Sequence, residues 1–118
     1  LMAVDEQALP LTPLIIWADT RSSGEANGLR QGELGKKLHN ETGTPVHPMS
    51  PLPKLMWLKK HQPEVFNRGS RFISIKEWIV FQFTGQWLID YSIASATGLF
   101  NTQNLEWHAE ALRLAGID

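Results

Sequence analysis

One short helix has both of its ends marked in the sequence, and no other feature constrains the fold of this 118-residue chain as strongly. Ser50 is a preferred N-cap residue, and Pro51 suits the first helical turn, where its missing N–H needs no partner. Pro63 disfavours helical geometry at Gln62, so the helix should end near His61. We expect its inward face to consist of Leu52, Leu55, Met56 and Leu58.

A second helix is predicted from Ile75 to Thr84. Ser74 and Glu77 form a capping box at its start, and Gly85 is typical of a helix end. Apolar side chains surround most of its circumference, namely Ile75, Trp78, Ile79, Val80, Phe81 and Phe83. We therefore expect this helix to be buried between other elements, at the centre of the core.

Shorter elements are predicted around these two helices. Apolar runs at Leu1–Val4 and Leu14–Trp17 indicate adjacent strands, and residues 22–38 suit a helix that its four glycines interrupt or that its surroundings hold in place. The other expectations are a loop at 40–48, a helical turn from Pro63, an extended piece at 72–73, a strand at 87–89, a helical turn to Ala96 capped by Asp90 or Ser92, and a helix from Leu105 to Ala115 capped by Asn104.

Composition restricts the class of partner. The chain has 11 basic and 12 acidic residues, so it lacks the basic surface of a nucleic-acid binder or a polybasic membrane patch. It has no cysteine for disulfides or zinc sites, and its four histidines lack metal-ligand spacing. Its apolar runs are shorter than the ~18 to 20 residues of a membrane span. We expect one domain-sized unit that binds a small ligand and neither nucleic acid, membrane nor metal.

Four blocks of residues carry the most specific signal. They are Trp17-x-Asp19-x-Arg21, Thr42-Gly43-x-Pro45, Met49 to His61 with Lys54-x-x-Trp57, and Thr84-Gly85 followed by Asp90 to Asn101. Their order and spacing resemble those of the FGGY family of carbohydrate kinases, and Trp107 and Gly116-Ile117 also match the family. The resemblance covers essentially the whole chain.

This resemblance implies an α/β fold, part of an actin-like, RNase-H-like ATPase domain that is predominantly helical here with a few short strands. Residues 1–118 would be an internal portion of the N-terminal, substrate-side domain, and the C-terminal nucleotide-binding domain would be absent. The full-length enzyme would be a cytoplasmic kinase that uses ATP and Mg²⁺. The fragment alone would bind neither and be inactive, because the Asp-x-Gly-Thr segment and the catalytic aspartate of the family lie outside it.

Residues 43–51, together with Ile15 to Asp19, are most similar to the gluconate kinases of the family. The implied reaction is transfer of the γ-phosphate of ATP to D-gluconate, which gives 6-phosphogluconate. Xylulose and glycerol are the alternative acceptors, although glycerol kinases usually have a tyrosine where Met49 stands. The implied partners are a sugar or sugar acid and the remainder of the kinase chain, and a homodimer of the parent is left open.

Five residues are candidates for contact with the substrate, and none is a candidate for catalysis. Trp17 resembles a family tryptophan beside the substrate, and its indole could pack on C–H groups or simply in a core. Arg21 could bind a substrate carboxylate bidentately or pair with Asp19. Met49 could shape the pocket or fill a gap in the core. Lys76 opposes the dipole in the first turn of its helix, so it either binds an anion or lies in solvent.

A different interpretation is a helical packing or interaction domain without catalysis, in which the aromatic helices serve a core or a partner. The positions of the candidate residues distinguish the two interpretations. The kinase interpretation requires these residues to face one cleft, whereas the packing interpretation allows them to lie apart. The residues that decide are Trp17, Asp19, Met49 and Lys76. An unpaired sheet edge would indicate a truncated domain, because whole domains usually cover such edges.

Overall fold

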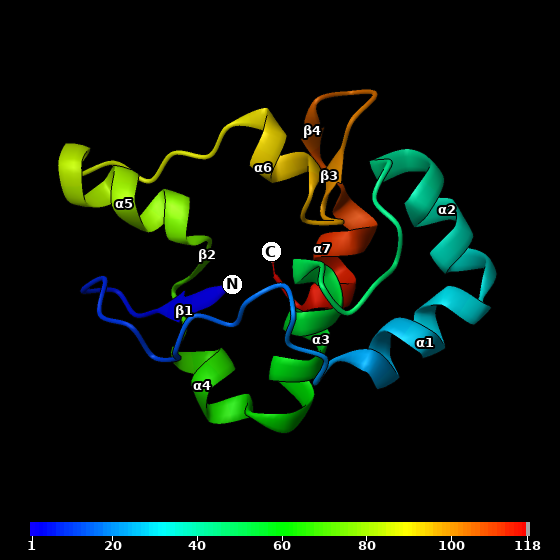
Figure 1. Ribbon diagram of the computed structural model, residues 1–118, viewed down its shortest axis with the longest axis horizontal. Coiled ribbons are helices and arrows are strands. Elements are labelled where there is room, and N and C mark those ends of the chain that lie inside the picture. Colours follow the sequence, from blue (N-terminus) through cyan, green and yellow to red (C-terminus); the bar gives the residue numbers. More distant parts are fainter. Residues whose placement is uncertain (118) are drawn as a thin grey trace.

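Seven helices and four short strands make up residues 1–117, the part of the chain that the computed structural model describes (Figure 1). The helices are α1 (Ser23–Gln31), α2 (Glu33–Thr42), α3 (Pro51–His61), α4 (Pro63–Arg68), α5 (Ile75–Thr84), α6 (Tyr91–Ser95) and α7 (Ala109–Ala115). The strands are β1 (Met2–Val4), β2 (Arg71–Ile73), β3 (Phe100–Asn101) and β4 (Glu106–Trp107). The predicted character, predominantly helical with a few short strands, is confirmed.

Helix α3 forms the centre of the core. Its Leu52, Leu55 and Leu58 are at most 2% exposed, and α1, α4 and α7 pack around it (Figure 1). The predicted start after Ser50 and the predicted end at His61 are both confirmed. Because the stripe of leucines meets other helices along its length, this short helix organises the packing of most of the chain.

Helix α5 is not the centre of the core, so the expectation for this helix is wrong. None of its residues is buried, although its capping box and its left-handed C-cap glycine are confirmed. One side packs through Trp78 and Phe81 against Trp87, with 3.9 Å between the ring centroids of Phe81 and Trp87. The other side exposes a stripe consisting of Ile75, Ile79 and Phe83. An apolar circumference predicts that a helix is covered, and residues 1–117 cover one side alone.

The strands form two separate antiparallel pairs. Met2 of β1 lies opposite Ile73 of β2, and Phe100 of β3 lies opposite Trp107 of β4. Within residues 1–117, β2 has β1 as its single strand neighbour, so its other edge is unpaired. This is the kind of edge that complete domains usually cover.

The segment that follows β1 runs alongside it without forming the expected second strand. The backbone groups of Leu1 and Ile15 exchange two hydrogen bonds, of 2.7 and 2.8 Å, but residues 14–17 have no regular strand geometry. Pro10 and Pro13 explain the irregularity, because proline has no N–H to donate to a ladder. The predicted neighbour of β1 is therefore present, but as an irregular segment.

Among the smaller elements, the interrupted helix predicted over residues 22–38 is present as α1 and α2, which are separated at Gly32. Its predicted end is wrong, because α2 continues to Thr42 and takes up the first residues of the loop expected at 40–48. Helix α4 begins at Pro63 and α6 is capped by Asp90, both as predicted. The strand expected at 87–89 is wrong, because these residues are irregular and no strand of the described chain runs beside them.

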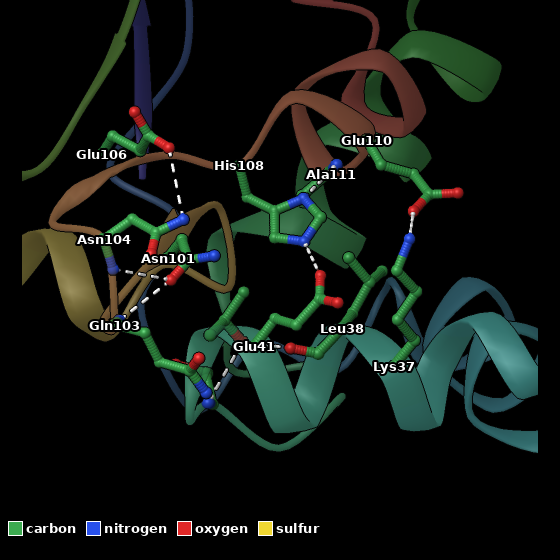
Figure 2. Close-up of polar contacts among 12 residues, drawn as sticks. Lys37, Leu38, Glu41, Asn101, Gln103, Asn104, Glu106, His108, Glu110 and Ala111 are labelled. Carbon is green, nitrogen blue, oxygen red and sulfur yellow. Dashed lines mark hydrogen bonds and ion pairs between the residues drawn. The ribbon is translucent and has the colours of Figure 1, made fainter.

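A β-hairpin replaces the first part of the expected final helix. The side-chain oxygen of Asn101 accepts hydrogen bonds from the N–H groups of Gln103 and Asn104, at 2.9 and 3.1 Å (Figure 2). Leu105 has a φ of 57°, in the left-handed region that helices avoid. The chain therefore turns back between β3 and β4, and α7 begins only at Ala109.

The N-cap of α7 is His108, not Asn104, and the same ring links α7 to α2. Its Nδ1 accepts a hydrogen bond from the Ala111 N–H at 3.3 Å, and its Nε2 lies 2.5 Å from Oε2 of Glu41 (Figure 2). Because Nδ1 is an acceptor, the proton of the neutral ring lies on Nε2 and is donated to the carboxylate. The Thr102 N–H also donates to the Glu41 carbonyl. These contacts hold the end of α2, and the loop that follows it, beside the hairpin.

Candidate functional site

A cavity of about 1040 Å³ opens in the middle of the molecule. Its wall includes the segment before α1, the loop between α2 and α3, the first turns of α3, the connection from β2 into α5, and the α6–β3 region. Most of the lining side chains are apolar, and serines, threonines and Lys54 lie among them. A concave apolar space with a few polar groups is the usual form of a small-molecule site.

Two of the five candidate residues border this cavity together. Trp17 reaches it from the segment before α1, and Met49 from the loop before α3. Both side chains remain open to solvent, with 74% of Trp17 and 49% of Met49 exposed. Large apolar side chains on two segments that border one cavity can pack on the C–H groups of a ligand.

Asp19 and Arg21 do not line the cavity, and they bind each other. Nε of Arg21 donates to Oδ1 of Asp19 at 2.9 Å, and Nη2 donates to Oδ2 at 2.7 Å. The guanidinium also stacks over the ring of Trp57, 5.0 Å from its centroid. These hydrogen bonds from Arg21 lower the pKa of the Asp19 carboxyl. The bidentate fork that a substrate carboxylate would need is therefore already occupied.

Lys76 also lies outside the lining of the cavity. Its ammonium donates to the Asp90 carboxylate, which lowers the pKa of Asp90, and both side chains are partly exposed. The other oxygen of Asp90 accepts the Ile93 N–H at 3.0 Å and caps α6. Lys76 thus joins α5 to the start of α6. Of the four residues chosen to decide convergence, two line one cavity and two are engaged in ion pairs.

Lys54 has a position that the sequence analysis did not foresee. Its side chain is buried, and Nζ donates to the main-chain carbonyls of Asp19, at 3.1 Å, and Pro48, at 2.5 Å. Burial lowers the pKa of its ammonium. The available signal is spacing, since Lys54 precedes Leu58 by four residues and therefore shares the buried face of α3.

The described residues contain neither a metal-ligand group nor a helix that could span a membrane. No group of three His, Cys, Asp or Glu side chains among residues 1–117 is arranged to hold a metal ion. None of the helices in that range is both long enough and apolar enough to cross a membrane.

Comparison with known proteins identifies the relatives of the chain. The model for the N-terminal domain of the FGGY family of carbohydrate kinases matches residues 1–118. The gluconokinase of Bacillus subtilis (strain 168) is 46% identical over 116 residues, which are 98% of this chain and 23% of that protein. The xylulose kinase of Staphylococcus xylosus is 33% identical over 118 residues, 100% of this chain and 24% of that protein.

The solved structures agree with these relatives. The crystal structure of gluconate kinase from Lactobacillus acidophilus matches with a TM-score of 0.94 and 33% identity. The match covers 99% of this chain and 24% of that one. The chain therefore spans about a quarter of the length of the curated relatives that it matches.

Proposed function

The chain belongs to the FGGY family of carbohydrate kinases and has part of their actin-like ATPase fold, and we propose that its parent protein phosphorylates D-gluconate. A hydroxyl oxygen of gluconate attacks the γ-phosphorus of ATP, ADP leaves, and 6-phosphogluconate forms as the hydroxyl proton passes to a base. The observation that carries this proposal is that the gluconokinase of Bacillus subtilis is more similar to the chain than the xylulose kinase of Staphylococcus xylosus is, over nearly the same residues.

Xylulose is the second candidate acceptor. A xylulose kinase and a gluconate kinase of Lactobacillus acidophilus match the chain equally well in fold and in identity. Fold similarity therefore supports a sugar kinase without separating these two acceptors, and the choice of gluconate depends on sequence similarity.

In this proposal, Trp17 and Met49 contribute to two walls of the acceptor site. The indole face packs on the C–H groups of the sugar chain, and its N–H donates a hydrogen bond to a hydroxyl. The thioether of Met49 adapts its shape to the same chain from the neighbouring loop. Contact with a ligand would also cover part of the large exposed surface of both side chains.

The other three candidates have supporting places in this proposal. Asp19 and Arg21 stabilise each other and keep the segment that carries Trp17 in one shape. Lys76 would reach an acidic substrate only by releasing Asp90, so it ranks behind the two wall residues. Neither ion pair is deeply buried, so solvent screens both pairs and each contributes little to stability.

The cofactors of the reaction would be held by the rest of the parent. The described residues offer no carboxylate cluster that suits Mg²⁺, so they do not fit the metal of a Mg²⁺–ATP complex. About three quarters of a relative's length lies outside this chain and is available for the nucleotide, the metal and the base. Residues 1–118, as an internal portion of the N-terminal domain, would therefore be inactive alone.

The remainder of the parent chain is also a partner in this proposal, because two exposed features of residues 1–117 need to be covered. The exposed stripe of α5 and the unpaired edge of β2 lie next to each other in the chain, and both are features that folded proteins normally cover. We assign their cover to the part of the parent chain that lies outside residues 1–118.

The test is a kinase assay on the full-length parent with Mg²⁺ and ATP, in which ADP release is measured with gluconate, xylulose, glycerol and ribulose at equal concentrations. We expect the highest kcat/KM with gluconate, and no activity from residues 1–118 alone. A higher kcat/KM with xylulose would favour the second candidate. If none of the four sugars increases ADP release, the kinase function itself is contradicted.

A further inference from the structure

We propose that Lys54 is a positioning residue that sets the separation of Trp17 and Met49, the two side chains that border the cavity. Its ammonium connects the main chains of the two segments that carry them. The inference depends on the proposed function, because it assigns Lys54 a role in the site where the acceptor sugar would bind.

Lys54 lies between the segment that carries Trp17 and the segment that carries Met49, which are two walls of the cavity. Its Nζ donates to the carbonyl of Asp19, two residues after Trp17, and to the carbonyl of Pro48, directly before Met49. Asp19 is 35 residues from Lys54 in sequence, so the contact is tertiary rather than local. A single charged group therefore connects two segments that are separated in sequence by α1 and α2.

The burial of Lys54 supports a role for the ammonium itself. The side chain is 1% exposed, and lysine is almost never fully buried without a partner. Among residues 1–117 no ion pair includes Lys54, so its acceptors are neutral carbonyls. An apolar side chain could fill the same space without losing the hydration of a charge. What it could not supply is two charge-assisted hydrogen bonds to two different segments.

A second donor holds the same carbonyl. The hydroxyl of Ser22, which is fully buried, donates to the Pro48 carbonyl at 3.2 Å. Ser22 directly follows the segment of Trp17, so it also joins the two walls. No buried side-chain nitrogen or oxygen among the described residues lacks a hydrogen-bond partner, so this network is complete. Ser22 therefore offers a milder way to loosen the same connection.

Lys54 and Trp57 of the Lys-x-x-Trp motif hold the same segment by different groups. Lys54 binds the main chain at Asp19, while the ring of Trp57 lies under the guanidinium of Arg21. Arg21 in turn binds both carboxylate oxygens of Asp19. The spacing of three residues puts both motif side chains on one side of α3. Together, Lys54 and Trp57 hold the segment from Asp19 to Arg21, which follows Trp17 in the chain.

The first experiment compares Lys54→Met with Lys60→Met in the full-length parent. Methionine replaces the unbranched stem of lysine as far as Cε and removes the ammonium, and Lys60 is an exposed lysine on the same helix. We expect Lys54→Met to raise the KM for the acceptor sugar about tenfold or more, with the KM for ATP changed by less than about twofold. Lys60→Met should resemble the wild-type protein in both constants.

A merely structural role would give a different result. In that case Lys54→Met would lower the thermal midpoint and the fraction of active enzyme, while the KM for the acceptor in the surviving enzyme stayed at the wild-type value. That outcome would overturn the inference. If Lys54→Met does not fold, Ser22→Ala decides the question, because it removes one of the two donors to Pro48 and should raise the acceptor KM in the same direction.

A measurement independent of catalysis separates this inference from the proposed function. Spin labels attached through Trp17→Cys and Met49→Cys, in a parent whose other cysteines are replaced, report the separation of the two walls by pulsed electron paramagnetic resonance. We expect one narrow distance distribution with Lys54 and a broader one with Lys54→Met. Identical distributions would contradict the positioning role. Absence of sugar-dependent ADP release by the wild-type parent would contradict only the proposed function.

Discussion

Replacing Phe83 with alanine tests whether the remainder of the parent covers the exposed stripe of α5. Phe83 is 86% exposed within residues 1–117, so almost all of its side chain is available for a new contact. Full burial of such a side chain is worth about 1.5 to 3 kcal/mol, and 86% of that is about 1.3 to 2.6 kcal/mol. We therefore expect Phe83→Ala to destabilise the full-length parent by about 2 kcal/mol.

The assay is thermal unfolding of the full-length parent by calorimetry. A loss of about 2 kcal/mol should lower the midpoint of the affected domain by about 4 to 8 °C, if that domain has about 150 to 250 residues. Gln82→Ala is the matched control, because Gln82 is an exposed polar neighbour on the same helix. Surface substitutions of this kind change stability by less than about 0.5 kcal/mol.

The comparison of the two variants can refute the reasoning. If Phe83→Ala and Gln82→Ala shift the midpoint equally little, Phe83 is still exposed in the parent, and the remainder of the chain does not cover the stripe. In residues 1–118 alone, Phe83→Ala should change the unfolding free energy by less than about 0.5 kcal/mol. A large loss in that fragment would mean that Phe83 already makes contacts there.

Two further predictions concern single contacts. Gly35→Ala should destabilise the protein in urea unfolding, because the added Cβ would lie 2.2 Å from the Leu29 carbonyl oxygen. Gly28→Ala meets nothing within 4 Å and should stabilise its helix by about 1 kcal/mol, so equal midpoints for the two variants would contradict the close approach. Arg21 lowers the pKa of the Asp19 carboxyl, mainly through side-chain hydrogen bonds. Because this folded-state pKa is depressed, the stabilisation is present above the unfolded pKa and is lost as the pH falls through the folded one. Titration by NMR should show the pKa of Asp19 rising in Arg21→Met, and an unchanged pKa would show that Arg21 is not its cause.

The ends of helices are the part of this fold that sequence predicts best. Ser50 and Pro51 mark the start of α3, while Ser74 and Gly85 mark the two ends of α5. Such signals work because capping groups and special backbone conformations act within one turn of the residue that carries them. The hairpin at Leu105 is not predictable in this way, since nothing in a leucine signals a positive φ.

The candidate site is predictable only in part. Trp17 and Met49 belong to recognisable motifs, and both border the cavity. Asp19 and Arg21 belong to the same motif as Trp17, yet they satisfy each other's hydrogen bonds. Sequence can identify residue types that are able to bind a small ligand, but it does not reveal which of them already have partners inside the protein.

By itself, the sequence determined the family, the limits of the main helices and two residues of the cavity wall, because motifs and caps are properties of short segments. Tertiary structure decided that α3 rather than α5 is the centre of the core, since burial depends on which surfaces meet and not on how apolar each one is. It also decided the place of Lys54, whose two carbonyl acceptors come from segments 35 and 6 residues away. A buried ammonium acquires its role from those acceptors, and only the folded chain brings them together.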